Sequence, residues 1–218
     1  MPRESKQAKL NRALLVNQRM QTQYPQAASE LNSTDSFSFL IAVILSAQTS
    51  DAAVNQVTPA LFNRWPDAFS LADADPNDVA ETIRRIGFFK VKAKHCIATA
   101  QMIVSDYAGQ VPQTLAELMR LPGVGRKTAN VVLAQSFGVS EGIAVDTHVF
   151  RIAHRLGFVA PGANTPNKVE QELLRLYPSA LWGEINRHWV LFGREFCIAR
   201  QPHCMLCPLA DICPSAVK

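Results

Sequence analysis

Apolar residues recur along most of the chain at the three- and four-residue spacing of an amphipathic α-helix. The first such segment carries Leu10, Leu14 and Met20 on one face, whereas residues 37–47 are apolar on nearly every side, which predicts a fully buried helix. No stretch shows the sustained alternation of a half-buried β-strand. The pattern predicts an all-α protein with helices at residues 4–24, 37–47, 52–65, 76–86, 90–107, 114–121, 126–137, 147–156, 166–177 and 181–196.

Residues that favour helix ends set several of these boundaries. Small polar side chains at 33–36 offer N-caps for the apolar helix, and Asp51 is expected to cap the next one. Asp75 and Thr165 each precede a proline at the first helical position, where the missing N–H has no intrahelical partner to lose. Gly87 is expected to close the helix that Asp75 opens.

The stretch LPGVGRKTAN, residues 121–130, connects two of the predicted helices. Its proline and Gly123 end the first helix, Val124 can anchor the turn to the core, and Gly125 lets the chain turn again. Two glycines two residues apart permit positive φ and a close approach of backbone. N–H groups at the start of the second helix, next to Arg126, would then form an anion site suited to phosphate. An ordinary helical hairpin has the same pattern, so both interpretations remain open here.

Lys127 adds chemistry to this turn. It falls in the first turn of the second helix, where the positive end of the helix dipole disfavours an ammonium, and an uncharged amine is a nucleophile. Asp146 follows nineteen residues later, and its apolar lead-in predicts a position in the interior at the N-cap of the next helix. Asp146 is therefore either a cap alone or the acid/base partner of a partly buried Lys127.

The distribution of charge indicates a polyanion as partner. The formal net charge is +4, from 22 basic and 18 acidic side chains. Residues 83–105 contain five lysines and arginines and no acid, and residues 118–140 contain three and no acid. Two acid-free basic stretches are typical of a surface that binds nucleic acid, although two solvated helix faces have the same composition.

The sequence gives no indication of a secretory signal or of a membrane span. The opening MPRESKQAKL is charged and lacks the apolar region of a secretory signal, and the longest apolar run, residues 40–45, is too short to span a membrane. We therefore expect a cytoplasmic, monomeric protein with no membrane contact. Structural disulfides are not expected in that compartment.

Four of the five cysteines lie in the last 22 residues and are arranged as C-x6-C-x2-C-x5-C. Zinc ribbons usually use two separated C-x2-C pairs, whereas a short continuous wrap favours a four-iron, four-sulfur cluster. Zinc remains the alternative at this point. The fifth cysteine, Cys96, stands on an apolar helix and is interpreted as a core residue. The predicted metal ligands are Cys197, Cys204, Cys207 and Cys213.

The glycine hairpin ending in lysine, the downstream VDTH at residues 145–148 and the four-cysteine tail occur here in one order. Together they resemble the endonuclease III family within the helix-hairpin-helix DNA glycosylases, over nearly the whole chain. The resemblance implies two helical lobes with a DNA-binding groove between them. Residues 28–140 would be a six-helix lobe with the hairpin at about 114–137, and residues 1–27 with 141–218 would be the lobe whose loop 197–213 carries a [4Fe–4S] cluster.

The resemblance also implies a function and assigns residues to it. The family excises oxidised pyrimidines from double-stranded DNA and nicks the strand at the abasic site through a lysine Schiff base. By position, Lys127 matches its catalytic amine and Asp146 its catalytic carboxylate. Gln48 matches the residue that fills the gap left by the flipped nucleotide, and Phe88 a second wedge at which an aliphatic residue is common. The remaining DNA contacts implied are Gly123, Val124, Gly125, Arg126 and Arg200.

Two features set limits on this assignment. The loop between the first two cysteines often carries more basic residues in the family, whereas Arg200 is its only constant cation here. A protein of another class, a non-catalytic DNA-binding module with a structural metal site, would use Lys127 as one more phosphate contact. The two readings differ in whether Lys127 forms a covalent bond to the sugar.

Overall fold

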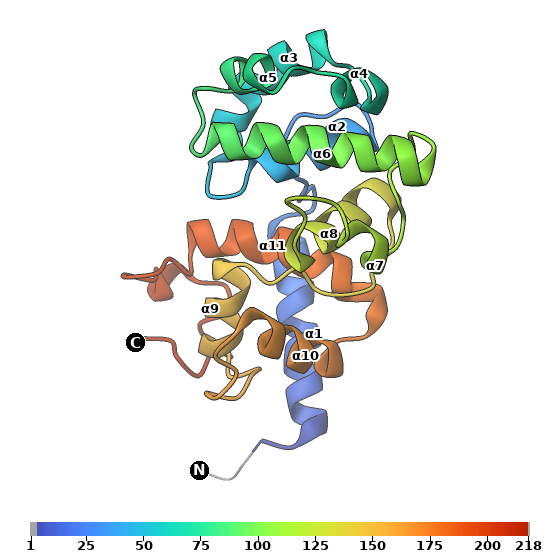
Figure 1. Ribbon diagram of the computed structural model, residues 1–218. Helices are drawn as coiled ribbons and strands as arrows, with labels where there is room; N and C mark the ends of the chain where they lie inside the picture. Colours follow the sequence, from blue (N-terminus) through green and yellow to red (C-terminus); the bar gives the residue numbers. More distant parts are fainter. Residues whose placement is uncertain (1–3, 218) are drawn as a thin grey trace. The chain divides into compact units, whose positions relative to one another are not determined.

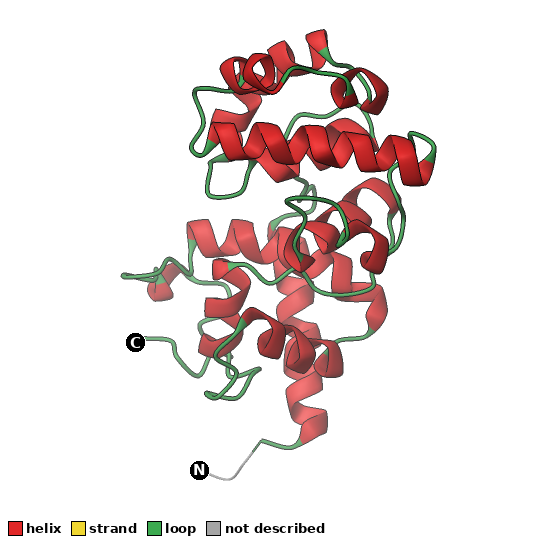
Figure 2. Ribbon diagram, viewed as in Figure 1, coloured by secondary structure: helices red, strands yellow, loops and turns green. Residues whose placement is uncertain are grey.

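The computed structural model describes residues 4–217 (Figure 1). This part of the chain forms helices, turns and loops with no β-strand, which confirms the all-α prediction (Figure 2). The helices divide between two compact units, one formed by residues 29–139 and the other by the described residues up to 28 and from 140 onward. Each unit has its own buried core.

The unit of residues 29–139 is built around two helices, the buried α2 (Ser36–Leu45) and the long α6 (Phe89–Tyr107). Every residue of α2 after its first is buried, as the apolar pattern predicted, and α2 packs against α3, α6 and α8. The long α6 lies along α4 and α5 (Figure 1). The helices are α2 (Ser36–Leu45), α3 (Asp51–Arg64), α4 (Ala68–Ala72), α5 (Pro76–Thr82), α6 (Phe89–Tyr107), α7 (Leu115–Leu118) and α8 (Arg126–Val132), which continues into a π-helical turn at Leu133–Phe137.

Local capping explains most of these boundaries. Asp35 caps α2, where its carboxylate accepts from the Ser38 amide at 2.8 Å. Asp75 caps α5 ahead of Pro76, as predicted. The expectation that Asp51 caps α3 is wrong, because Ser50 has the extended backbone of an N-cap and accepts from the amide of residue 53. Asp51 is instead the first helical residue, where its charge complements the helix dipole.

Three further boundaries differ from the sequence prediction. α4 is only five residues long, too short to show periodicity, and it forms because Asp67 and Ser70 make a capping box. The helix expected at 76–86 ends at Thr82, because residues 83–88 form tight turns that keep Ile83 and Ile86 buried. The helix expected at 126–137 changes from α to π geometry at Leu133, and Gly138 ends it with φ +67°.

The second unit packs the first helix of the chain against its last ones. α1 contributes Ala13, Val16 and Met20 to the core and packs on α11, while α9 packs on both α10 and α11. Trp189 is fully buried and lies in ring contact with Tyr177 and the Phe158 ring. The helices are α1 (Lys6–Gln23), α9 (Thr147–Arg155), α10 (Pro166–Leu176) and α11 (Trp182–Glu195), with 3₁₀ turns at Ser179–Leu181 and Cys204–Leu206.

Candidate functional site

The hairpin between α7 and α8 is held against α6 by its first glycine. Gly123 has φ +77°, and a Cβ there would lie 2.9 Å from Nδ1 of His95. The Thr99 hydroxyl of α6 donates to the carbonyl of residue 122 at 2.7 Å, and Val124 is buried with 7% of its surface exposed. The predicted anchoring role of Val124 is thus confirmed. Only glycine satisfies both the backbone angle and the close approach of α6 at position 123.

No contact among the described residues requires a glycine at position 125. Gly125 is the N-cap of α8 with an extended backbone (φ −90°), so of the two hairpin glycines only Gly123 uses the positive φ that glycine permits. A Cβ at Gly125 would have no atom of the described residues within 4 Å. It supplies no side chain to accept hydrogen bonds from the first turn of α8, whose N–H groups have no intrahelical acceptors. The first turn of α8 can therefore be approached closely from outside.

Lys127 and Asp146 occupy the helix ends that the sequence indicated, in different units. Lys127 is the second residue of α8 and is exposed rather than partly buried. Asp146 is the N-cap of α9, where the amides of His148 and Val149 donate to its Oδ1 at 2.8 and 2.9 Å. It is half-buried rather than interior. Among the described residues, both hydrogen bonds to this carboxylate go to Oδ1, so Oδ2 can take a further role while the cap persists.

Gln48 and Phe88 share an unusual backbone conformation. Both have left-handed φ, +55° and +57°, which is uncommon outside glycine. Gln48 follows α2 in a short loop, and Phe88 is the N-cap residue of α6. Both side chains are exposed, and two-thirds of the Phe88 surface faces solvent. An exposed apolar ring on a strained turn gains nothing from burial in the protein, which is typical of a functional position.

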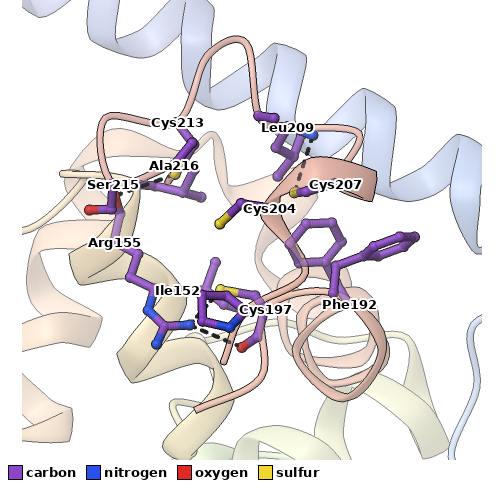
Figure 3. Close-up of a pocket in the computed structure, with 14 residues that line it drawn as sticks. Ile152, Arg155, Phe192, Cys197, Cys204, Cys207, Leu209, Cys213, Ser215 and Ala216 are labelled. Atoms are coloured by element: carbon purple, nitrogen blue, oxygen red, sulfur yellow. Dashed lines mark hydrogen bonds between the residues drawn. The ribbon is translucent and has the colours of Figure 1, made fainter. Parts of the chain in front are cut away.

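The four cysteines of the tail line a single pocket (Figure 3). The pocket encloses about 420 Å³ of empty space, part of which is open to solvent. Two sulfurs, those of Cys204 and Cys207, come from the short 3₁₀ turn and its end, and Cys197 and Cys213 approach from other sides of the pocket (Figure 3). Its remaining lining is mostly apolar and comprises Ile152, Arg155, Leu156, Phe192, Phe196, Pro202, Leu209, Ala210, Ser215 and Ala216.

Two arginines of α9 tie the cysteine loop to the helix that Asp146 opens. Arg155 donates to the carbonyls of Ile198 and Ala199, both at 2.7 Å, and its guanidinium also contacts Cys197 (Figure 3). Arg151 donates to the Cys197 carbonyl at 2.9 Å. Sequence reasoning missed both arginines, because nothing in the spacing of α9 distinguishes them from solvent-facing basic residues.

The donor set fits an iron–sulfur cluster. In residues 4–217 no three histidine, cysteine, aspartate or glutamate side chains are arranged to hold one metal ion. A four-iron cluster makes a different demand, because each thiolate binds its own iron and the four sulfurs only have to surround a shared cavity. Burial raises the pKa of the Cys207 and Cys213 thiols. Bound iron would offset the free-energy cost of forming thiolates in this pocket, because iron favours the thiolate form.

Arg200 is exposed on the loop between the first two cysteines, where it can meet a ligand from solvent. Cys96 is fully buried on α6, which confirms its interpretation as a core residue. Of the helices formed by residues 4–217, none combines the length and apolar character needed to cross a membrane.

Two family models match the chain. The HhH-GPD superfamily base excision DNA repair protein model matches residues 41–179, which include the hairpin, Lys127 and Asp146. The iron–sulfur binding domain of endonuclease III matches residues 197–213, a range that begins and ends at a cysteine. The two matches together include residues of both units.

Curated relatives and solved structures agree with these models. Endonuclease III of Synechocystis sp. is 44% identical over 97% of this chain and 94% of its own length. Endonuclease III of Escherichia coli K12 is 40% identical over 89% of this chain and 91% of its own. A solved structure of a trapped endonuclease III–DNA covalent intermediate superposes with a TM-score of 0.88 at 38% identity, covering 98% of each chain. A thermostable thymine-DNA glycosylase, 21% identical with a TM-score of 0.84, shares the fold.

Proposed function

This chain belongs to the endonuclease III family of base excision DNA repair proteins, and we propose that Lys127 and Asp146 are the catalytic residues of its two activities. It is a DNA glycosylase that removes oxidised pyrimidines from duplex DNA and a lyase that then nicks the strand at the abasic site. It carries a [4Fe–4S] cluster. The sequence-based predictions of family, activity, cofactor and DNA substrate are thus confirmed.

The chemistry begins with a base outside the helix. A damaged base cannot be attacked within the stack, so it is flipped out at a cost of a few kcal/mol. Gln48 and Phe88 offset that cost by occupying the gap, one in each strand. Their exposed, left-handed turns support this role, because both side chains are accessible to a ligand in the free protein.

Lys127 and Asp146 then act on the flipped nucleotide. The amine of Lys127 forms a bond to the anomeric carbon of the sugar as the bond from that carbon to the base breaks. Asp146 accepts the proton of the attacking amine and stabilises positive charge that develops on the sugar. The sugar ring then opens: the bond from the anomeric carbon to the ring oxygen breaks as the C=N bond of the Schiff base forms, and the ring oxygen takes up a proton. The Schiff base acidifies the neighbouring carbon, and loss of a proton there expels the 3′ phosphate by β-elimination. Lys127 supports this proposal by its exposure at the first turn of α8, where a substrate can reach it.

The hairpin positions the strand without reading its sequence. Backbone amides at Gly123 and Gly125 hold a phosphate, with Val124 as anchor and Arg126 beside them. The open space around Gly125 supports this assignment, because a Cβ there would meet no protein atom and would instead occupy space that a phosphate needs. Arg200 adds a contact from the cysteine loop.

Cys197, Cys204, Cys207 and Cys213 hold the cluster. When bound, it supplies four iron–thiolate bonds that keep the loop 197–213 folded. Arg151 and Arg155 fix that loop on α9, the helix capped by Asp146. The hairpin lobe of residues 28–140 and the cluster lobe of the remaining residues are the proposed domains, which the two compact units support. We place the enzyme in the cytoplasm, where DNA and reduced thiols coexist.

Covalent trapping tests the assignment of Lys127. The protein is incubated with duplex DNA that contains one abasic site in the presence of borohydride, which reduces the Schiff base to a stable adduct. Lys127→Gln should form no adduct and should not nick the strand, yet it should bind abasic DNA nearly as well, because only one of several cationic contacts is lost. Lys168→Gln, which removes an exposed lysine on α10, is the control. An adduct formed by Lys127→Gln at the wild-type rate would place the nucleophile elsewhere.

A further inference from the structure

Lys92 lies inside the protein, although it belongs to a basic stretch. The acid-free segment 83–105 was expected to present its charges to solvent, but Lys92 is only 5% exposed. Its Nζ donates to Oγ1 of Thr49 at 2.6 Å. The ion pairs among the described residues do not include Lys92. Burial raises the pKa of the nearby Cys96 thiol to about 12, so this thiol stays neutral and supplies no counter-charge. A charge buried with so little compensation is unfavourable for folding, so packing alone does not account for a lysine here.

Lys92 contacts both of the segments that have left-handed φ, the turn at Gln48 after α2 and the turn at Phe88 before α6. Thr49, which accepts from its ammonium, directly follows Gln48 in the loop after α2. At its other end, the Lys92 amide donates to the carbonyl of Phe88 at 3.0 Å. One residue therefore contacts the Gln48 turn through its side chain and the Phe88 turn through its backbone. Among the described residues, the positive-φ residues other than glycine are these two and Ala108.

We propose that Lys92 is a positioning residue that fixes the Gln48 turn relative to the Phe88 turn, so that both side chains enter the duplex together when the nucleotide is flipped. The inference rests on the proposed function, because it presumes that Gln48 and Phe88 fill the gap. It concerns two turns and one helix of the same compact unit. A rigid spacing matters because displacements of about 1 Å can change rates by as much as 10²-fold.

The ammonium suits this task better than an apolar side chain. A methionine would fill the same volume but would let the Gln48 turn shift, because an apolar contact has no preferred direction. A charge-assisted hydrogen bond is short and directional, and the 2.6 Å distance to Thr49 fits one. Only 5% of the Lys92 surface is exposed, so its action on DNA is indirect.

The test compares variants that remove one end of the hydrogen bond. Lys92→Met keeps the buried stem and loses the donor, Thr49→Val loses the acceptor, and Thr49→Ser retains it. Single-turnover excision of one oxidised pyrimidine is measured at saturating enzyme, so that weaker binding does not enter. We expect Lys92→Met and Thr49→Val to slow excision by about 10- to 10²-fold, and the double variant to be no slower than the slower single one. Thr49→Ser should restore the wild-type rate, and Lys168→Met is the charge control.

A second measurement reports directly whether Gln48 and Phe88 enter the duplex. A fluorescent purine analogue placed opposite the lesion brightens when it is unstacked, and this signal should fall in Lys92→Met and Thr49→Val while borohydride trapping on abasic DNA persists. Equal excision rates and equal fluorescence in Lys92→Met and Lys168→Met would overturn the proposal. If Lys92→Met fails to fold, Thr49→Val against Thr49→Ser decides in the same way. Failure of the wild-type protein to trap or excise would instead refute the proposed function.

Discussion

The guanidinium of Arg155 donates a hydrogen bond to Sγ of Cys197 over 3.2 Å, so the last turn of α9 contacts one of the proposed cluster ligands directly. The same guanidinium binds the two carbonyls that follow Cys197. A single side chain therefore orients a ligand sulfur and fixes the start of the cysteine loop. Hydrogen bonds to ligating groups tune metal sites and hold their ligands in place.

Arg155→Met should weaken retention of the cluster. Its apolar stem would still fill the pocket wall, but the sulfur and the two carbonyls would lose their donor. Loss of such partners typically lowers metal affinity about 10- to 100-fold. We expect less iron per protein and a weaker absorbance near roughly 400 nm, measured as colour loss over time with a chelator present. Arg175→Met, at an exposed position on α10, should bleach like the wild type.

Asp146 can be separated into cap and catalyst by two substitutions. Asparagine caps helices as well as aspartate, so Asp146→Asn should keep the thermal midpoint of the wild type while slowing base release about 10²- to 10⁴-fold. Asp146→Ala should lose both functions and should also lower stability by about 1 kcal/mol. Single-turnover excision and thermal unfolding on the same preparations distinguish them. Base release by Asp146→Asn at the wild-type rate would reduce Asp146 to a helix cap.

The two hairpin glycines should respond differently to alanine. Gly123→Ala forces a side chain into left-handed backbone and against His95, so it should lower the free energy of unfolding by about 1–2 kcal/mol or more. Gly125→Ala meets no protein atom and needs no change in φ, so stability should change little. Its Cβ would instead obstruct a phosphate.

DNA binding measured over a range of salt concentrations completes this comparison. Gly125→Ala should bind more weakly, because its Cβ would keep a phosphate from the backbone amides. The slope of log K against log salt should change little, because the slope of about −0.9 per phosphate comes from neutralisation by Lys and Arg, and backbone amides carry no net charge. Urea unfolding on both variants gives the matching stabilities. Equal loss of stability in Gly123→Ala and Gly125→Ala would contradict the proposal that Gly125 faces a phosphate rather than another part of the protein.

His188 predicts a pH dependence of stability. It is buried on α11 with 4% exposure, its Nδ1 donates to the Glu184 carbonyl at 2.9 Å, and burial lowers its pKa. The unfolded chain therefore takes up a proton below about pH 6.5 that the folded protein resists, so stability falls as the pH drops from there toward the lowered folded pKa. Thermal midpoints at about pH 7.5 and 5.5 should differ less in His188→Gln than in the wild type. An equal difference in both proteins would remove His188 as the cause.

Features encoded within three or four residues were predictable from the chain alone. Helix periodicity, the Asp75 and Thr165 caps and the turn at Gly123 depend on neighbouring side chains, so they could be placed before any packing was known. The cysteine wrap and the order of hairpin, VDTH and tail were equally local, and they sufficed to indicate the family and its cluster. Local rules did not identify the N-cap where two adjacent residues both favour that position, as Ser50 and Asp51 do at the start of α3.

Burial and long-range partners were decided only by tertiary packing. Lys92 and Lys127 are both lysines in acid-free basic stretches, yet one is buried against Thr49 and the other is exposed on α8. Arg155 looks like any other arginine at a helix end until the chain brings Cys197, 42 residues later, to its guanidinium. Which charged side chain turns inward depends on segments far away in sequence, because the free energy of burying a charge is set by the partner that meets it.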